Sequence, residues 1–547
     1  MVVPEPRVWR AARPHVVRVA RAVKPRVVRV THAVRPGAAR VAQAVKPGVV
    51  RAASAVTAGS SQLARGTKKL TTPQLTACAA TLGLVLSAGV VTAAGPWDSS
   101  GQRTAERDWA ASRGRQGGAD HGRNSGTSSG SAGAPKPAPS APSVLAALGG
   151  AAGSGSAPGT AALADTLDSL LSAPALGPHP AAAVVDVATG RLLYAKGADK
   201  PLTPASTTKI ATAAAALSAA GPDHRIETRT VLKPDSTDVV LVGGGDPTLT
   251  AREDGAGNAS LRTLADKTAA ALAERHLNEI TLTYDTSLYE GPELHTIGVD
   301  GNIALVTPLM VDEARLDDST SGTATRSTDP AADATAKFAA LLEDRGIKTT
   351  SKGSAKAAKN ADELASVSSP PLSALVERML TNSDNDIAEA LARQVAIATG
   401  EPASFEGGAA AIKKQLKTLE LPLDGVDFAD GSGLSRGNEL TAEFLTTLLA
   451  TSATPAHPEL RPVLTGLPVA GFTGTLTGRY TPDASGTGVI RAKTGTLTGV
   501  NTLAGTVVDA DGRLLAFAFL ATDTTDREAA PKALDAAASA VAACGCR

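Results

Sequence analysis

The segment "PASTTKI", residues 204–210, places a serine three residues before a lysine, and the alanine-rich run "ATAAAAL" follows it directly. Residues three apart on an α-helix share one face, so the hydroxyl of Ser206 and the amine of Lys209 are expected to lie side by side at the start of a helix. This spacing is common in helices. Its interpretation therefore depends on what the rest of the chain supplies.

Two further short patterns accompany this segment. The triplet "SDN" contributes Ser383 and Asn385, and "KTGT", residues 493–496, begins with Lys493. Each of the three patterns occurs once, in this order, with 177 residues from Ser206 to Ser383 and 110 from there to Lys493. Segments so far apart in the sequence act together only if the fold brings them to one pocket.

The three patterns together predict a nucleophilic serine. A serine hydroxyl is a weak nucleophile that needs an adjacent base, and a lysine is a base only if burial or a neighbouring cation lowers its pKa. Lys493 would be the cation beside Lys209, and Ser383 would provide a hydroxyl that relays the proton. Asn385 offers an amide that aligns a peptide group of the substrate. We therefore expect attack by Ser206 with Lys209 as its base.

The "KTGT" segment is expected to bind the substrate. Gly495 lets a strand backbone approach the substrate closely. Backbone N–H groups of Ser206 and Thr496 would form an oxyanion hole, and the dipole of the helix behind the serine favours the negative charge. Lys493 with Thr494 and Thr496 would bind a terminal carboxylate.

The order STTK, SDN, KTG resembles the pattern of penicillin-binding proteins and class A β-lactamases. Flanking words narrow the resemblance to the D-alanyl-D-alanine carboxypeptidase/endopeptidase family (peptidase family S13, low-molecular-mass class C penicillin-binding proteins). It covers about residues 161–540. The words are "LVGGGDPTL" (241–249), "SDNDIAEAL" (383–391), "DGSGLSRGNELT" (430–441) and "LPVAGFTGTLTGRY" (467–480), the last followed by "RAKTGTLTGV".

The resemblance implies a serine-type D-Ala-D-Ala carboxypeptidase. In this family the serine, here Ser206, attacks the carbonyl of the penultimate D-alanine of a peptidoglycan stem peptide, and water then hydrolyses the acyl-enzyme. Some members also cut D-alanyl–diaminopimelyl cross-links, and penicillins acylate the same serine as inhibitors. Arg436, in the word "GLSR", would bind the free end of the stem's side chain. The alternative for Arg436 is a surface arginine beside a turn.

The resemblance and the hydrophobic patterns together predict an α/β (α+β) penicillin-binding, β-lactamase-like fold, with an antiparallel sheet flanked by helices. Segments 181–195 and 500–521 are predicted hairpins that turn at Thr189-Gly190 and Asp511-Gly512. Strand pairs near both ends of the folded body suggest a sheet assembled from distant segments. Further strands are expected at 238–245 and 279–284, and helices at 332–346, 372–380, 386–399 and 526–543.

The family carries an insertion domain between its first two motifs. Larger members nest a third domain within it, and 177 residues is short for that. We therefore expect one reduced insertion domain, with the missing piece between about residues 316 and 329, and a more open cleft. This puts endopeptidase activity in doubt more than carboxypeptidase activity. The expected organisation is a basic segment (1–71), a transmembrane helix or signal (72–95), a disordered linker (96–160), a catalytic domain (161–225 and 371–547) and an insertion domain (226–370).

The N-terminal part differs in charge from the rest. Residues 1–70 hold 15 Lys/Arg and one acid, whereas the remaining 477 hold 39 Lys/Arg and 52 acids. Prolines at 14, 25, 36 and 47 mark an 11-residue repeat. A helical segment on anionic lipid, a nucleic-acid contact and a disordered basic tail are all compatible with it.

Residues 75–95 carry no charge and are long enough to span a bilayer, with Lys68 and Lys69 before them and Asp98 after them. The positive-inside rule then places the catalytic body outside a cell membrane. The span is either a single-pass anchor or a cleaved export signal, because "TAAG" resembles a cleavage site.

Other classes of function find less support. The histidines form no HExxH motif and the cysteines no metal spacing, so no metal and no other cofactor is expected. The glycines of "GGGDP" lack the Gly-Lys-Ser/Thr of a phosphate loop. The catalytic body is expected to bind stem peptides and β-lactams but no nucleic acid. The alternatives are a serine β-lactamase of the same fold and a catalytically idle wall-associated scaffold.

Overall fold

The computed structural model describes residues 160–544, and its first helix, α6 (Thr160–Leu171), begins where the ordered body was predicted to start. The predicted basic segment, the transmembrane helix or signal and nearly all of the linker lie outside the described residues. Within residues 160–544, no helix has both the length and the apolar character that a membrane crossing requires.

The centre of the catalytic part is a five-stranded sheet in which every neighbouring pair is antiparallel, in the order β2-β1-β10-β9-β8. It joins the two predicted hairpins, because β1 near the start of the body pairs with β10 near its end, with Ala181 opposite Leu520. Both hairpin predictions are confirmed. The strands are β1 (Ala181–Asp186), β2 (Leu192–Lys196), β8 (Ile490–Leu497), β9 (Val500–Val508) and β10 (Leu514–Thr522).

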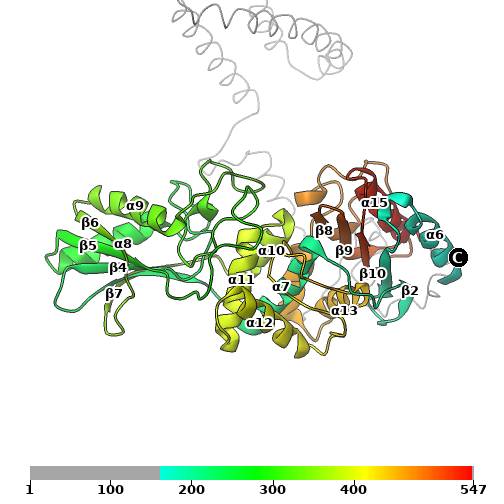
Figure 1. The fold of residues 1–547 in the computed structure, drawn as a ribbon, viewed down its shortest axis with the longest axis horizontal. Coiled ribbons are helices and arrows are strands. Elements are labelled where there is room, and N and C mark those ends of the chain that lie inside the picture. The colour runs from blue at the N-terminus through cyan, green and yellow to red at the C-terminus, as the bar shows by residue number, and fades with distance from the viewer. Residues whose placement is uncertain (1–159, 545–547) are drawn as a thin grey trace, which may run out of the picture. The chain divides into compact units, whose positions relative to one another are not determined.

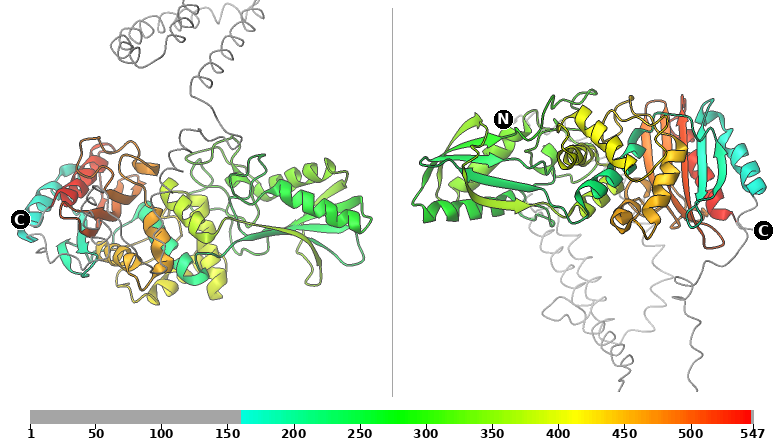
Figure 2. Two further views of the ribbon diagram at one scale, coloured as in Figure 1. Left: turned by 180° about the vertical axis from the view of Figure 1, so that it is seen from behind. Right: turned by 90° about the horizontal axis from the view of Figure 1, so that it is seen from below.

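Helices cover both faces of this sheet (Figures 1 and 2). All six residues of β1 are buried, as are eight of the nine in β9. One face packs on α7 (Thr208–Ala220), α10 (Leu372–Asn382), α11 (Asn385–Thr399), α12 (Phe405–Lys417) and α13 (Ala442–Ala453). The opposite face packs on α6 and α15 (Ala529–Ala543), through a core that contains Phe517 and Phe519.

Short helical elements connect these parts. They are α14 (Arg461–Thr465) and the 3-10 turns η2 (Pro174–Leu176), η3 (Ala205–Thr207), η5 (Pro458–Leu460) and η6 (Gly474–Leu476).

A second sheet lies between α7 and α10 in the sequence. Its order is β6-β5-β4-β3-β7, and it is mixed, because β4 pairs with β5 and β5 with β6 in parallel. The strands are β3 (Glu227–Leu232), β4 (Asp238–Val242), β5 (Glu279–Asp285), β6 (Lys348–Ser354) and β7 (Asp362–Ser368). Helices α8 (Leu261–Glu274) and α9 (Pro330–Glu343) pack on it through a separate apolar core centred on Phe338. The domain boundaries remain predictions.

A long connection, residues 286–329, joins β5 to α9. It holds a single 3-10 turn, η4 (Asp312–Ala314), whose three residues have φ angles of 53°, 55° and 55°. Left-handed backbone is uncommon for residues other than glycine, so three such residues in succession mark a strongly constrained turn. We call residues 286–329 the insertion arm. It packs against α11, where the backbone N–H of Ala304 donates to Asp386 at 2.9 Å.

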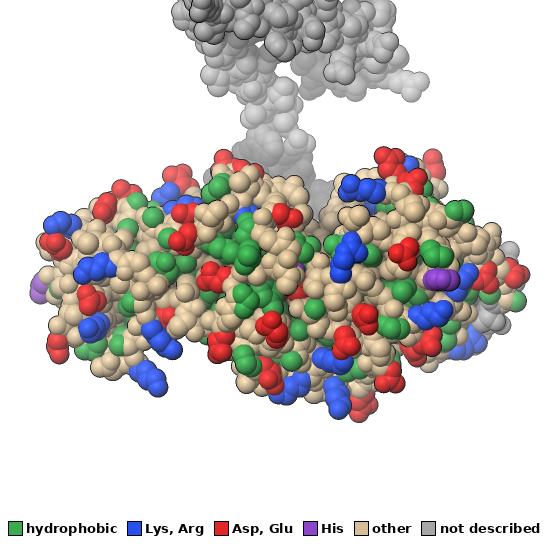
Figure 3. Space-filling model, viewed as in Figure 1, with side chains coloured by type: hydrophobic (Ala, Val, Ile, Leu, Met, Phe, Trp, Pro, Cys, Tyr) green, Lys and Arg blue, Asp and Glu red, His purple; other side chains and the backbone are tan. Residues whose placement is uncertain are grey.

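On the face of the molecule drawn in Figure 3, acidic and basic side chains are interspersed over both sheets. That face therefore carries no extended field of a single sign.

Candidate active site

Ser206 lies in η3, which continues directly into α7, so Lys209 sits on the first turn of that helix as predicted. The residue before the serine, Ala205, has a φ of 49°. Left-handed backbone is uncommon for a residue other than glycine. Gly433 lies against this turn, and a Cβ on Gly433 would lie 2.0 Å from the carbonyl oxygen of Ala205. The neighbouring loop can therefore approach the turn that carries the serine only without a side chain at this position.

The amine of Lys209 is fully buried and has three oxygen neighbours. Its Nζ lies 3.1 Å from Ser206 Oγ, 2.6 Å from Asn385 Oδ1 and 2.6 Å from the carbonyl oxygen of Ser432. The first two motifs thus meet at one nitrogen, although 176 residues separate Lys209 from Asn385.

The surroundings of Lys209 make its amine easier to deprotonate than an ordinary lysine. Burial, the largest effect, lowers the pKa of Lys209 to about 8, while the carboxylates of Asp430, Glu389, Asp384 and Asp386 act in the opposite direction. Burial is therefore the main reason for the low pKa, and it is one of the two causes expected from the sequence, the other being the cation Lys493.

The third motif meets the second on the other side of the serine. Lys493 Nζ, also fully buried, lies 2.8 Å from Ser383 Oγ and 2.7 Å from the carbonyl oxygen of Thr494. Burial, together with the positive charges of Lys209 and Arg479, holds the pKa of Lys493 well below its ordinary value. Ser383 caps the end of α10 in a left-handed conformation, with a φ of 58°, which turns the chain between α10 and α11.

Strand β8 is the edge strand of the central sheet on the side of the serine. Residues 468–470 cover its outer edge as far as Ala492, through hydrogen bonds such as Ala492 N to Pro468 O at 2.9 Å. From Lys493 to Leu497, no strand within residues 160–544 pairs with that edge. An uncovered edge can accept an extended peptide as an additional strand.

Gly495 brings this edge close to the serine. A Cβ at this position would lie 2.1 Å from Thr502 Oγ1, 2.6 Å from the carbonyl oxygen of Pro204 and 3.1 Å from the backbone nitrogen of Ser206. The strand can pass so near to η3 only without a side chain here. The close approach of the substrate that the sequence indicates for this glycine stays a prediction.

A cavity of about 540 Å³ opens onto Ser206. The second and third motifs line it through Ser383, Asn385, Thr494 and Thr496. The insertion arm also contributes to its wall, so the short insertion does not leave this side of the cleft bare. The lining residues from the arm are Asn302, Arg315, Gly322, Thr323 and Arg326.

Arg436 lies beside the site rather than in this cavity. Its guanidinium donates to the carbonyl oxygen of Thr498 at 2.5 Å, and among the described residues those that line the cavity do not include it. Its predicted role in binding the stem's side chain is therefore untested.

Sequence reasoning missed several residues of the cavity wall. Arg479 lines it and is held by Asp535, with contacts of 3.1 and 2.8 Å. Thr475 places its hydroxyl 2.9 Å from that of Thr494. Both belong to the word "GTLTGRY", which served only as a family marker. Asn302 lies in a stretch without any motif, so no signal in the sequence pointed to it.

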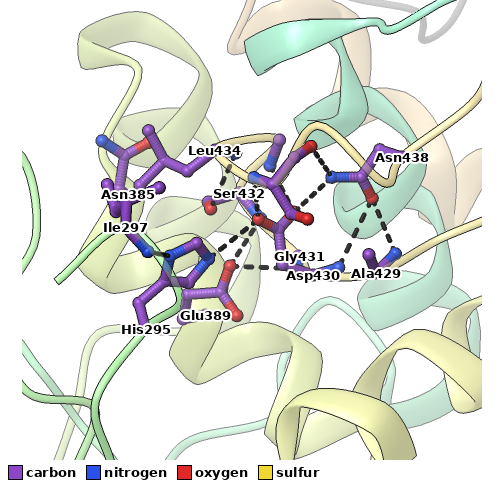
Figure 4. Close-up of polar contacts among 12 residues, drawn as sticks. His295, Ile297, Asn385, Glu389, Ala429, Asp430, Gly431, Ser432, Leu434 and Asn438 are labelled. Carbon is purple, nitrogen blue, oxygen red and sulfur yellow. Dashed lines mark hydrogen bonds and ion pairs between the residues drawn. The ribbon is translucent and has the colours of Figure 1, made fainter.

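Two buried clusters contain enough acids and histidines to suggest a metal site: His295, Glu389 and Asp430, and Glu313, Asp384 and Asp386. In the first, the oxygens of Glu389 and Asp430 accept N–H groups, among them that of His295 Nε2, 2.9 Å from Asp430 Oδ2 (Figure 4). In the second, arginines pair with Glu313 and Asp386. Such partners suit ion-pair networks better than cation ligands.

This arrangement defines a class of protein: serine enzymes of the penicillin-binding fold, with a buried lysine as the partner of the serine. Penicillin binding protein 4 from Haemophilus influenzae has a similar structure, with a TM-score of 0.56 and 22% identity, covering 68% of this chain and 97% of that chain.

The sequence profile of the D-Ala-D-Ala carboxypeptidase 3 (S13) family matches residues 163–300 and 314–543. A carboxypeptidase of Mycobacterium tuberculosis is 36% identical over 76% of this chain and 90% of its own length. The carboxypeptidase DacB of Mycolicibacterium smegmatis is 37% identical over 70% of this chain and 84% of its own length. The protein therefore belongs to the S13 family and is a D-Ala-D-Ala carboxypeptidase.

Replacing Gly495 by alanine should displace β8 from the serine, because the new Cβ has no room beside Thr502 and Pro204. We expect the rate of acylation by benzylpenicillin to fall about 100-fold, as small displacements of reacting groups do. Intact-protein mass spectrometry over a time course measures this rate.

The matched control is Gly255→Ala, whose Cβ would meet only ordinary contacts, the nearest at 3.6 Å. It should acylate at the wild-type rate. An equally fast Gly495→Ala variant would contradict the close approach described above.

Proposed function

We propose that this enzyme removes the terminal D-alanine of peptidoglycan stem peptides through an acyl-enzyme at Ser206. The observation that carries the proposal is the contact of a buried amine of lowered pKa, Lys209 Nζ, with Ser206 Oγ at 3.1 Å, inside a cavity lined by the other two motifs.

The hydrogen bonds of Lys209 orient it as a base. A neutral amine has two hydrogens and one lone pair. The carbonyl oxygens of Asn385 and Ser432 can only accept hydrogen bonds, so they occupy the two hydrogens. The lone pair is then directed to the third neighbour, Ser206 Oγ. Lys209 would take the hydroxyl proton as the oxygen attacks the carbonyl carbon of the penultimate D-alanine.

The second step is the departure of D-alanine. The carbon–nitrogen bond of the tetrahedral intermediate breaks, and the leaving nitrogen needs a proton. Ser383 and Lys493, 2.8 Å apart, are suited to deliver one. Water then attacks the ester: its hydroxyl forms the new bond to the acyl carbon, and its other proton replaces the one lost by the Ser383–Lys493 pair. The bond from the acyl carbon to Ser206 Oγ breaks, and Lys209 returns its proton to this oxygen as the shortened peptide leaves. The backbone N–H groups of Ser206 and Thr496 are our candidates for the oxyanion hole.

The binding of the substrate's terminal carboxylate is assigned to Lys493, Thr494 and Thr496. Arg479 lies on the same wall and adds a further positive charge. Asn385 would align the stem peptide along the open edge of β8, and Arg436 remains a candidate for its side chain. Because residues of the insertion arm line one side of the cleft, we favour carboxypeptidase over endopeptidase action. β-Lactams would acylate the same serine.

A Ser206→Ala variant should release no D-alanine from a stem-peptide substrate ending in D-Ala-D-Ala, because the nucleophile is gone. The measurement is a coupled assay of free D-alanine, with mass spectrometry to locate the benzylpenicillin adduct in the wild type. D-alanine release by the variant would refute the proposal. An acyl-enzyme that lasts only seconds, rather than hours, would instead support the alternative of a β-lactamase.

The acylation rate should depend on pH through Lys209. Below about pH 8 this amine gains a proton and cannot accept another, so the second-order rate should rise with pH and level off above that value. The measurement is the rate of acylation by a fluorescent penicillin at a series of pH values, with each reaction stopped at fixed times. A rate that stays constant between about pH 6 and about pH 9 would contradict the role of Lys209 as base.

We also propose that residues 75–95 anchor the protein in the cell membrane, with the catalytic body outside. The proposal is supported by the absence of charge in this span and by the two lysines that precede it. In a bacterial host the full-length chain should then remain in the membrane fraction with Met1 or Val2 as its first residue. A soluble protein that lacks the first ~95 residues would show instead a cleaved export signal.

A further inference from the structure

The orientation of Lys209 depends on two acceptor oxygens, and both are held by groups outside the three motifs. The first is Asn385 Oδ1. The amide nitrogen of the same side chain donates to the backbone carbonyl oxygen of Asn302 at 3.0 Å. This contact with the insertion arm requires the nitrogen on that side, and it therefore turns the oxygen towards Lys209.

The second acceptor is the backbone carbonyl oxygen of Ser432, which lies in the loop between α12 and α13. The two backbone N–H groups that precede it in the chain, those of Gly431 and Ser432, both donate to one carboxylate oxygen, Glu389 Oε1, at 3.0 and 2.8 Å. These two bonds hold the peptide groups that precede the Ser432 carbonyl (Figure 4). The carbonyl itself shares a planar peptide group with the N–H of Gly433, which donates to Asp430 Oδ1 at 2.7 Å.

Glu389 stands one helical turn after Asn385 on α11 and is 0% exposed. Asn385 and Glu389 thus lie one turn apart on the same face of α11. Asn385 contacts the amine of Lys209 directly, and Glu389 acts on it through the backbone at Ser432. The other oxygen of Glu389 lies 3.3 Å from Arg393 Nη1, and the guanidinium of Arg393 stacks 4.1 Å from the ring centroid of Phe405. Burial and the charge of Asp430 raise the pKa of Glu389, whereas the charge of Arg393 and the hydrogen bond from Ser432 lower it. The carboxylate accepts N–H groups from Gly431, Ser432 and Arg393, and these donors favour its ionised form.

The same loop is held from its other side by Asp430. Asp430 accepts the backbone N–H groups of Gly433 at 2.7 Å and Ser435 at 2.6 Å, and His295 Nε2 at 2.9 Å. His295 belongs to the insertion arm and is 2% exposed. Although burial acts to raise the pKa of Asp430, these hydrogen bonds lower it below its ordinary value.

We propose that Glu389 is a positioning residue for the reaction of Ser206. It holds the two peptide groups that precede the Ser432 carbonyl, while Asp430 holds the peptide group that contains it. Together they direct this carbonyl to Lys209 and thereby aim the lone pair of the amine at the serine. The proposal rests on the function proposed above. Glu389 touches neither the substrate nor the reacting atoms, and it acts through the loop backbone at Gly431 and Ser432.

Glu389 also acts on Lys209 through its charge. The charged groups that face this amine are Asp384, Asp386 and Glu389 on or beside α11, Asp430 in the loop, and Lys493 on β8. Removing the negative charge of Glu389 makes the protonated amine less favourable, so the pKa of Lys209 must fall further. A residue with a purely structural role would leave that pKa unchanged.

Glu389→Gln tests the proposal, because glutamine keeps an acceptor oxygen but loses the charge. In a plot of the rate of acylation by benzylpenicillin against pH, we expect the rising part of the curve to move to lower pH by roughly one unit. We expect Glu389→Ala to acylate about 10- to 100-fold more slowly at its own pH optimum, since the backbone that leads to the Ser432 carbonyl is no longer held. Thermal unfolding monitors the folded state of both variants.

The matched control is Asp285→Asn. Asp285 is also a buried carboxylate that accepts two backbone N–H groups, those of Ser287 and Ala357, both at 2.7 Å, but it lies at the end of β5 in the second sheet. It should retain the wild-type rate and pH profile.

The outcomes are distinguishable. The positioning role is wrong if the folded Glu389→Gln variant shows the same pH dependence of acylation as the wild type. It is also wrong if Asp285→Asn shifts this pH dependence equally. In both cases the proposed function stands. If Ser206 of the wild type is not acylated at all, the proposed function itself fails. If Glu389→Ala does not fold, the pH dependence of acylation of Glu389→Gln alone decides whether Glu389 has the positioning role.

Discussion

In the proposed mechanism, the activity depends on one buried nitrogen atom that loses its proton readily and is correctly oriented. Lys209 is fully buried, which lowers its pKa to about 8, and its three neighbours are all oxygens. Burial alone would leave the lone pair free to point anywhere. Two acceptors that cannot donate, on Asn385 and Ser432, remove this freedom and leave one direction, towards Ser206. The protein environment thus supplies both the basicity and the aim of the amine.

The rest of the fold serves to bring these oxygens together. The sheet places β8 beside η3, and Gly495 and Gly433 allow close approaches that a side chain would prevent. The helix pair α10–α11 breaks at Ser383 and Asp384, so that Ser383 faces Lys493 while Asn385 faces Lys209. The one turn between α10 and α11 therefore places a hydrogen-bond partner beside each of the two lysines.

The insertion arm belongs to this site as much as to the second sheet. It supplies the Asn302 carbonyl that orients Asn385, the imidazole of His295 that holds Asp430, and part of the cavity wall. The insertion carries none of the three motifs, yet its backbone determines which way a catalytic amide points. This explains why so long a connection without regular structure can be fixed in place: buried ion pairs such as Arg326–Asp386 tie it to α11.

The sequence by itself determined the chemistry and the outline of the fold. Ser206, Lys209, Ser383, Asn385 and Lys493 stand in motifs whose residue types and spacing are unusual in combination, and the hairpins at 181–195 and 500–521 follow from local alternation and turn residues. Only the tertiary structure decided the hydrogen-bond partners of these groups. Ser432, Asn302 and Gly433 contribute backbone atoms or lack a side chain, and Glu389 accepts backbone N–H groups 42 and 43 residues away. A local pattern cannot reveal them, because their effect lies in where the folded chain directs a carbonyl or an N–H group.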